Sequence, residues 1–243
     1  MKIVGIIQAR MGSTRLPGKV LKYVLGKPLI AYVVEQLRKV SSLNEVILAT
    51  STLQTDDQLA NWARGSNVKC FRGSESDVLK RYCDAAKESG ADIIVRIAGD
   101  CPLLEPNIAD KVMKLHLETN ADYSANTIER TFPRGWDVEN MQMELLELAD
   151  RESKDPFQRE HVTPFFWQQP NRFHLESYEA KDEFFRPDLR LCVDTEDDFQ
   201  LIRLILEGLD KGSSPVDGKH IIELFKKHPE WAKINSHVVQ KHL

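Results

Sequence analysis

Short apolar runs alternate with amphipathic stretches through the first half of the chain, and this alternation limits the possible folds most strongly. Runs rich in Ile and Val predict buried strands, and apolar residues at helical spacing predict the helices between them. We expect strands at residues 2–8, 45–50, 68–71, 92–97 and near 122–125, and helices at 29–40, 56–62, 77–88 and 108–118. This order predicts an α/β fold with a mainly parallel sheet covered by helices on both faces.

The pattern is looser after residue 126. We expect helices at 144–152, 158–167 and 196–207, an extended segment at 172–177 and a late strand at 189–193. A length of 243 residues suits one large domain. The sequence therefore predicts a single domain over residues 1–243, in which residues 131–188 form a small inserted arm or flap.

The segment that directly follows the first expected strand is rich in residues that bind phosphate. It runs from Gln8 to Lys19 and combines two glycines, two hydroxyl residues, two arginines and a lysine. Glycine lets backbone N–H groups turn toward an anion, and arginine and lysine supply positive charge. Parallel sheets place ligands at the carboxyl ends of their strands. The segment therefore predicts a triphosphate site, with a solvated basic turn as the alternative.

Two better-known phosphate motifs do not match this segment. A P-loop needs four residues between its glycines and a Ser or Thr after its lysine. Here five residues separate Gly12 from Gly18, and Val20 follows Lys19. The G-x-G-x-x-G dinucleotide fingerprint is also missing from the sequence.

Two aspartates follow expected strands and are candidates for a metal site. Asp100 comes after the strand at 92–97, and Asp194 comes after the strand at 189–193. Mg²⁺ prefers a few carboxylates together with waters and substrate phosphates. Asp100 and Asp194 are therefore expected to hold Mg²⁺ beside the triphosphate. The alternatives are a turn residue before Pro102 for Asp100 and a helix N-cap for Asp194.

Composition excludes several classes of partner. The formal net charge is -4, whereas proteins that bind duplex nucleic acid usually carry a basic excess. No segment approaches the ~20 apolar residues of a membrane span. The four cysteines form no C-x-x-C pair, which argues against a zinc ribbon or disulfide framework and favours a reducing compartment. We expect a cytoplasmic protein with neither nucleic-acid nor membrane partners.

The phosphate segment resembles the nucleotide-binding signature of the cytidylyltransferases that activate sugar acids, including the acylneuraminate and 3-deoxy-manno-octulosonate enzymes. The branch called spore-coat polysaccharide biosynthesis protein F is most similar. It also matches the run from Phe71 to Tyr82, the Gly99-Asp100-Cys101-Pro102 turn and the Val193-Asp194-Thr195 triplet. The octulosonate enzymes carry Asp-Glu-Pro or similar at the Asp100 turn, so that acceptor is disfavoured.

The resemblance implies a Rossmann-like sheet of the nucleotide-diphospho-sugar transferase type, Mg²⁺-dependent transfer of CMP from CTP to a sugar acid, and a homodimer. A hydroxyl of the acceptor would attack the α-phosphorus of CTP and release pyrophosphate in glycan biosynthesis. The expected catalytic residues are Lys19, Arg15 and Asp100, and the expected metal ligands are Asp100 and Asp194. The expected nucleotide-binding residues are Ala9, Arg10, Gly12, Ser13, Arg15, Lys19, Arg72 and Ser74.

Residues 131–188 match the better-known enzymes poorly and are expected to bind the acceptor or form the dimer. Arg134, Arg159 and His161 are the acceptor candidates, because arginine suits a carboxylate. Surface salt bridges are the alternative for the arginines, and a histidine with satisfied hydrogen bonds at an interface is the alternative for His161. The apolar run 165–167 is a candidate dimer contact. Other functions remain open: another NTP, a phosphorylated or amino-sugar acceptor, or nucleotide binding without catalysis.

Overall fold

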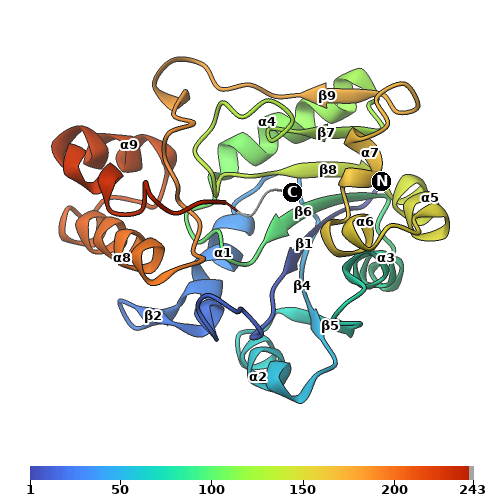
Figure 1. Cartoon of the computed structure of the whole chain (residues 1–243), viewed down its shortest axis with the longest axis horizontal. Coiled ribbons are helices and arrows are strands. Elements are labelled where there is room, and N and C mark those ends of the chain that lie inside the picture. Colours follow the sequence, from blue (N-terminus) through green and yellow to red (C-terminus); the bar gives the residue numbers. More distant parts are fainter. Residues whose placement is uncertain (241–243) are drawn as a thin grey trace.

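The computed structural model describes residues 1–240, which form a seven-stranded sheet in the order β5-β4-β1-β6-β8-β7-β9 (Figure 1). Neighbouring strands are parallel from β5 to β6, and β8 is antiparallel to both of its neighbours. The predicted mainly parallel α/β sheet is confirmed. The strands are β1 (Ile3–Gln8), β4 (Glu45–Ser51), β5 (Lys69–Gly73), β6 (Ile93–Ala98), β7 (Tyr123–Ala125), β8 (Glu139–Gln142) and β9 (Leu175–Ser177).

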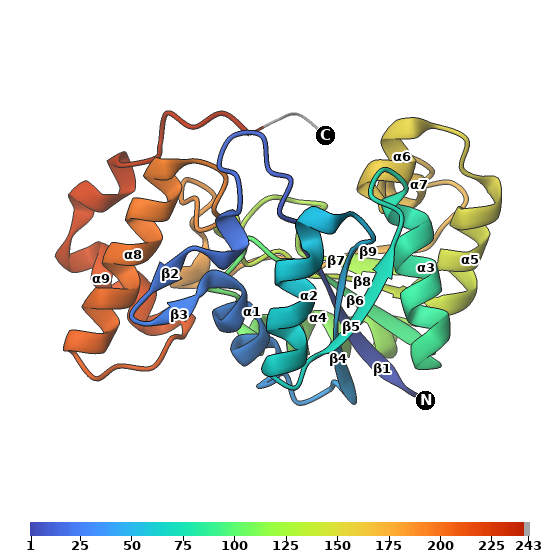
Figure 2. The same ribbon diagram turned by 90° about the horizontal axis from the view of Figure 1, so that it is seen from below.

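Helices cover both faces of the sheet, and each face has its own apolar core (Figure 2). Alternate residues of β1 enter opposite cores: Ile7 belongs to one and Ile6 to the other, as the period of a strand requires. The Ile7 core includes residues of α1 (Leu29–Leu37), α2 (Asp57–Gly65), α4 (Pro106–Thr119), α8 (Glu196–Lys211) and α9 (Gly218–Lys227). The Ile6 core includes residues of α3 (Val78–Ser89), α5 (Met143–Glu152) and α7 (Pro164–Trp167).

Smaller elements complete the chain. The short helix α6 (Pro156–His161) packs against α3 and α7. A two-stranded ribbon and four 3₁₀ turns lie outside the main sheet. They are β2 (Tyr23–Val24), β3 (Lys27–Pro28), η1 (Lys19–Leu21), η2 (Gln54–Asp56), η3 (Asp182–Phe184) and η4 (Pro229–Lys233). The helices formed by residues 1–240 are all too short or too polar to cross a bilayer.

The loops after β1 and β6 approach each other closely at the carboxyl end of the sheet. Gly99 N–H donates to the Gln8 carbonyl at 2.7 Å. A Cβ atom at Gly99 would lie 2.6 Å from the Cβ of Ala9 and 2.8 Å from the Gln8 oxygen. Because real Cβ atoms do not make contacts this short, glycine is required at residue 99. The phosphate segment and the Asp100 turn are thereby brought side by side.

The prediction of a strand at 189–193 is wrong. This segment makes a single isolated bridge, between Arg134 and Arg190, and otherwise crosses the carboxyl end of the sheet as a loop. Its apolar residues Leu191 and Val193 are fully buried, so the apolar pattern reflects burial rather than strand pairing. The loop still lies beside the Asp100 turn, because Val193 N–H donates to the Asp100 carbonyl at 2.8 Å.

Residues 131–188 supply two strands of the main sheet, β8 and β9, and the helices α5, α6 and α7. The helix expected at 158–167 is broken into α6 and α7. The break follows from the left-handed backbone at Val162 (φ 69°) and from Pro164, which begins the second helix. The prediction that 165–167 is a contact surface is wrong for its two phenylalanines: Phe165 and Phe166 are buried in the chain's own core.

Candidate active site

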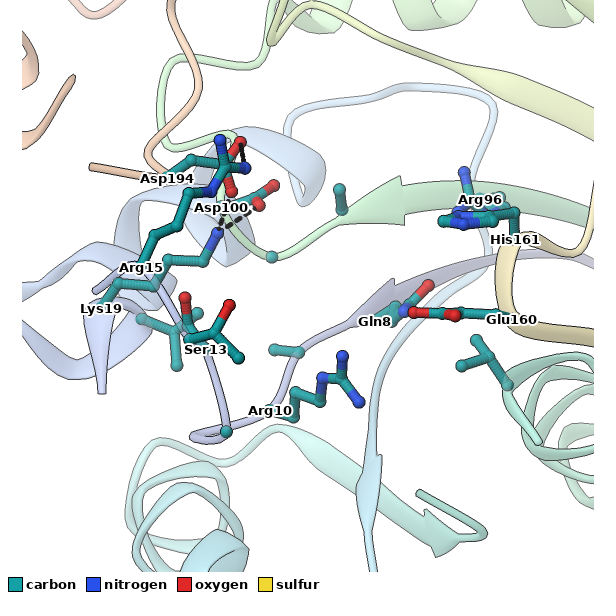
Figure 3. Close-up of a pocket in the computed structure, with 17 residues that line it drawn as sticks. Gln8, Arg10, Ser13, Arg15, Lys19, Arg96, Asp100, Glu160, His161 and Asp194 are labelled. Carbon is teal, nitrogen blue, oxygen red and sulfur yellow. Dashed lines mark hydrogen bonds and ion pairs between the residues drawn. The ribbon is translucent and has the colours of Figure 1, made fainter. Parts of the chain in front are cut away.

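A cavity of about 450 Å³ opens at the carboxyl end of the sheet (Figure 3). The loop after β1 lines one side of it, and the end of β6 with Asp100 forms its floor. Asp194 from the 189–195 loop and the carboxyl end of α6 complete the wall. The expected nucleotide-binding residues that line this cavity are Ala9, Arg10, Gly12, Ser13, Arg15 and Lys19.

A buried aspartate fixes the shape of the phosphate loop, the part of the phosphate segment that follows β1 (residues 9–19). Asp56 Oδ1 accepts from Met11 N–H at 2.7 Å, and Asp56 Oδ2 accepts from Thr50 and from the backbone and hydroxyl of Ser51. The loop then turns back on itself, since Gly18 N–H donates to the Met11 carbonyl and Gly18 is left-handed at φ 69°. The sequence indicated only that Asp56 begins a helix, and its role in holding the loop was missed.

Asp56→Asn is expected to make the protein less stable at neutral pH and less sensitive to acid. Burial raises the pKa of Asp56, but hydrogen bonds from Ser51 and Met11 lower it more, so the net pKa is below 3.8. A carboxyl group with a lowered pKa stabilises the fold above pH 3.8, and this contribution is lost as the pH falls further. Urea unfolding should show a loss of about 1–3 kcal/mol at pH 7 and a smaller loss near pH 3.

The matched control for that experiment is Asp57→Asn, because Asp57 is the next residue and its side chain is about half exposed. We expect this variant to change the free energy of unfolding by less than about 1 kcal/mol. An Asp56→Asn protein that loses equal stability at both pH values would contradict the assignment.

Lys19 joins the two predicted metal ligands. Its Nζ lies 2.6 Å from Asp100 Oδ2 and 2.8 Å from Asp194 Oδ1 (Figure 3). Burial lowers the pKa of Lys19, but the two carboxylates raise it more, so the net shift is upward. The two acids, 94 residues apart in the sequence, thus converge on a single cation.

Asp194 is held by two arginines as well. Its Oδ2 lies 2.8 Å from Arg15 Nη2 and 2.5 Å from Arg190 Nη2. Burial raises the pKa of Asp194, but Lys19, Arg15 and Arg190 lower it more, and the carboxylate therefore stays ionised at neutral pH. The cluster combines three cations with two acids.

A second buried aspartate, Asp198, holds Asp194 and Arg190 in place. Asp198 accepts from Asp194 N–H at 2.9 Å, from Arg190 Nε at 2.9 Å and from Asn235 Nδ2 at 2.8 Å. The N-cap of α8 is Thr195, which forms a capping box with Asp198, so the alternative role of Asp194 as an N-cap is wrong. The spacing of Thr195 and Asp198 is the sequence signal that could have shown this.

Four polar side chains lie at the other end of the cavity. Gln8 ends β1, Arg96 lies on β6, and Glu160 and His161 end α6 (Figure 3). Burial lowers the pKa of His161 and the nearby charge of Arg96 lowers it further, against the opposing effect of Glu160. His161 is therefore neutral at physiological pH. Arg96 was missed by the sequence analysis, although a charge in a strand of Ile and Val is itself a signal.

The family model for cytidylyltransferases matches residues 4–222 of this chain. The chain belongs to the cytidylyltransferase family. Its sequence is 31% identical over 237 residues to the spore coat polysaccharide biosynthesis protein SpsF of Bacillus subtilis, covering 95% of this chain and 96% of that protein. The family resemblance on which the sequence analysis relied is confirmed.

Two further comparisons describe how far the likeness extends. A cytidylyltransferase structure from Leptospira borgpetersenii is similar over the full length of both chains, with a TM-score of 0.88 and 32% identity. A 3-deoxy-manno-octulosonate cytidylyltransferase of Geobacter metallireducens is 38% identical over 115 residues, covering 46% of this chain and 44% of that enzyme. The likeness to the octulosonate enzyme is thus confined to part of the chain.

Two of the expected nucleotide-binding residues of this cytidylyltransferase lie outside the cavity lining. Arg72 donates to the carbonyls of Ser51 and Leu53 at 2.9 Å and pairs with Asp57 at 2.7 Å. Ser74 Oγ accepts from a backbone N–H in the turn before α3. Both residues order the segments next to the phosphate loop.

Two of the three acceptor candidates are also placed outside the cavity lining. Arg159 binds Asp77 with two nitrogens, at 3.0 and 2.6 Å, and Asp150 at 2.7 Å. This is the salt-bridge alternative considered for it. The backbone of Arg134 bridges to the 189–191 segment. His161 is the acceptor candidate that lines the cavity.

Proposed function

We propose that this cytidylyltransferase transfers CMP from CTP to a sugar acid and releases pyrophosphate, as a step in the synthesis of a surface polysaccharide or other glycan. The names of the relatives support this reading, since one acts in spore coat polysaccharide biosynthesis and another on 3-deoxy-manno-octulosonate. The observation that carries the proposal is the convergence of Lys19, Asp100 and Asp194 beside a phosphate-type loop.

Asp100 and Asp194 fit the requirements of a magnesium site. Their carboxylates already share one cation, the ammonium of Lys19. Within residues 1–240, no group of three or more His, Cys, Asp or Glu side chains could hold a metal. Mg²⁺ suits such a two-carboxylate site, because it takes its remaining ligands from water and substrate phosphates. When bound, Mg²⁺ would neutralise charge on the triphosphate.

The phosphate loop supplies the other positive charges that the reaction needs. Transfer of a nucleotidyl group depends mainly on positioning and on neutralising the charge of the departing pyrophosphate. Arg10, Ser13 and Arg15 line the cavity with donors for the phosphate oxygens. Lys19, held between the two acids, is placed to exchange one of them for a phosphate oxygen when CTP binds. These residues orient the α-phosphorus toward the acceptor hydroxyl.

His161 is the acceptor-binding residue that we retain from the sequence analysis, since it lines the cavity at the end away from Lys19. We also propose that the enzyme works as a homodimer in the cytoplasm. The free cysteines at 70, 83, 101 and 192 are compatible with a reducing compartment.

The proposal is tested by measuring pyrophosphate release from CTP, GTP, ATP and UTP with Mg²⁺ and a panel of sugar acids, sugar phosphates and amino sugars. We expect release from CTP with at least one sugar acid. Release with another NTP, or with a phosphorylated or amino sugar instead, would change the assigned substrate. CTP that raises the melting temperature without any pyrophosphate release across the panel would indicate a nucleotide-binding protein without catalysis.

A further inference from the structure

The end of the cavity away from Lys19 contains four polar side chains, of which the proposed function uses only His161. Arg96 and Gln8 come from neighbouring strands and share one face of the sheet, because Gln8 pairs with Ala98, two residues beyond Arg96. Glu160 and His161 approach from the carboxyl end of α6 (Figure 3). The group therefore joins the sheet to the segment 131–188.

Arg96 is held in place by a buried acid. Its Nη1 donates to Glu139 Oε2, and Tyr123 O–H donates to Glu139 Oε1 at 2.6 Å. Glu139 and Tyr123 are both buried, whereas 18% of the Arg96 side chain remains exposed. Burying an ion pair of this kind is costly and adds little stability. Its retention in an apolar strand at the wall of a cavity points to a role in binding.

Part of the hydrogen-bonding capacity of this group is unused. Only Nη1 of Arg96 is paired: its Nε, a buried donor, has no partner within residues 1–240. The buried acceptor Gln8 Oε1 likewise has none in the described part of the chain. Buried polar atoms are normally paired, so these two are candidates for pairing with a ligand. Because a guanidinium is planar, an edge that includes Nε can bind a carboxylate with two parallel bonds.

The charges of the reactants decide which of them can use the open edge of Arg96. The triphosphate is matched by Arg15 and Lys19 at the opposite end, and cytosine and ribose carry no negative charge. A sugar acid carries one carboxylate. The open Nε edge of Arg96 thus complements the carboxylate of the acceptor, whereas Glu160 at the same end of the cavity suits its hydroxyl groups.

We propose that Arg96 determines the specificity for the acceptor by binding its carboxylate. Gln8 Oε1 accepts a hydrogen bond from a hydroxyl group of the same sugar acid. Glu139 and Tyr123 are positioning residues that fix the guanidinium. This inference rests on the proposed function. It adds which residue binds the carboxylate of the sugar acid: Arg96 on β6, rather than Arg134 or Arg159.

The test compares the wild type with Arg96→Met on a sugar acid that the wild type uses and on the carboxamide of that sugar acid. With the acid, Arg96→Met is expected to lower kcat/KM for the acceptor by about 100-fold and to leave KM for CTP unchanged. With the uncharged carboxamide, the two enzymes should be similarly slow. Arg96→Lys keeps the charge but not the planar fork. With the sugar acid, its kcat/KM should lie between that of the wild type and that of Arg96→Met.

Two further variants separate binding from folding. Arg96→Met leaves Glu139 without its cation, so Arg96→Met/Glu139→Gln removes both charges and should show the same selective loss. Arg172→Met is the control: it breaks another Arg–Glu pair, Arg172 with Glu152 at 2.6 Å, on the exposed surface and away from the cavity lining. This control should not alter the use of the acceptor.

Three outcomes would overturn the assignment. An Arg96→Met enzyme that keeps its kcat/KM for the acid, or that loses affinity for CTP instead, shows that Arg96 does not read the carboxylate. An enzyme whose preference for the acid over the carboxamide survives the substitution shows the same. A wild type that uses none of the sugar acids with CTP refutes the proposed function itself, and with it this inference.

Discussion

Lys19→Ala is expected to lower kcat/KM for CTP by about 10²- to 10³-fold, the effect of removing one charge aimed at a transition state. The Nζ atom of Lys19 is a cation shared by Asp100 and Asp194, and it lies beside the donors of the phosphate loop. Without it, the acids repel each other and the triphosphate loses a counter-charge. Steady-state release of pyrophosphate at varied CTP measures the loss.

The fold should survive this substitution, because Asp194 keeps Arg15 and Arg190 as partners. A thermal melt of the purified variant checks this. The matched control is Lys22→Ala, which removes a lysine three residues away that pairs with the exposed Glu196 at 2.6 Å. That control should turn over CTP at the wild-type rate. Wild-type turnover by Lys19→Ala would exclude Lys19 from the catalytic machinery.

The sequence was sufficient to predict the strands that are buried on both faces. The runs that became β1, β4 and β6 are dominated by Ile, Val and Ala, and a central parallel strand requires little else. The strand β8 was missed because Glu139, Asn140 and Gln142 give it no apolar alternation. Its place in the sheet follows from tertiary pairing with β6 and β7, which no local pattern encodes.

Asp194 lies beside Asp100 as expected, although the segment that carries it was assigned to the wrong kind of structure. Asp194 was assigned to the end of a strand, and its segment is a loop. It nevertheless lies beside Asp100, because the buried residues that precede it tie the loop to the Asp100 turn. The contributions of Asp56 and Asn235 could not be predicted, because Asp56 acts on Met11 and Asn235 acts on Arg190 and Asp198, and these contacts join segments that are far apart in the sequence.

Arg96 and Arg159 show the limit of reading charge from sequence alone. Both are arginines near the cavity, and residue type gives them equal claim to an acid substrate. The structure separates them by their partners: the fork of Arg159 is taken by Asp77 and Asp150, whereas Arg96 keeps an unpaired Nε among the described residues. A binding role depends on which hydrogen bonds remain open, and that becomes visible only in three dimensions.

Asp100→Asn is expected to reduce pyrophosphate release by about 10²- to 10⁴-fold and to weaken or abolish its dependence on Mg²⁺. Asparagine keeps the size of the side chain and removes the charge that a divalent cation requires. Asp100 is a sharper test than Asp194, which also binds Arg15 and Arg190 and so contributes more to the fold. Initial rates over a MgCl₂ titration, at saturating CTP and acceptor, give both quantities.

Asp197→Asn is the matched control for this titration. Asp197 is three residues from Asp194, about half exposed, and pairs with His237 at 3.1 Å rather than with Lys19. The control should show the rate and the Mg²⁺ midpoint of the wild type. If Asp100→Asn remained active with an unchanged Mg²⁺ midpoint, the convergence on Lys19 would be a structural salt bridge. The two acids would then serve to hold the phosphate loop against the sheet, and the metal would have to be bound by the nucleotide alone.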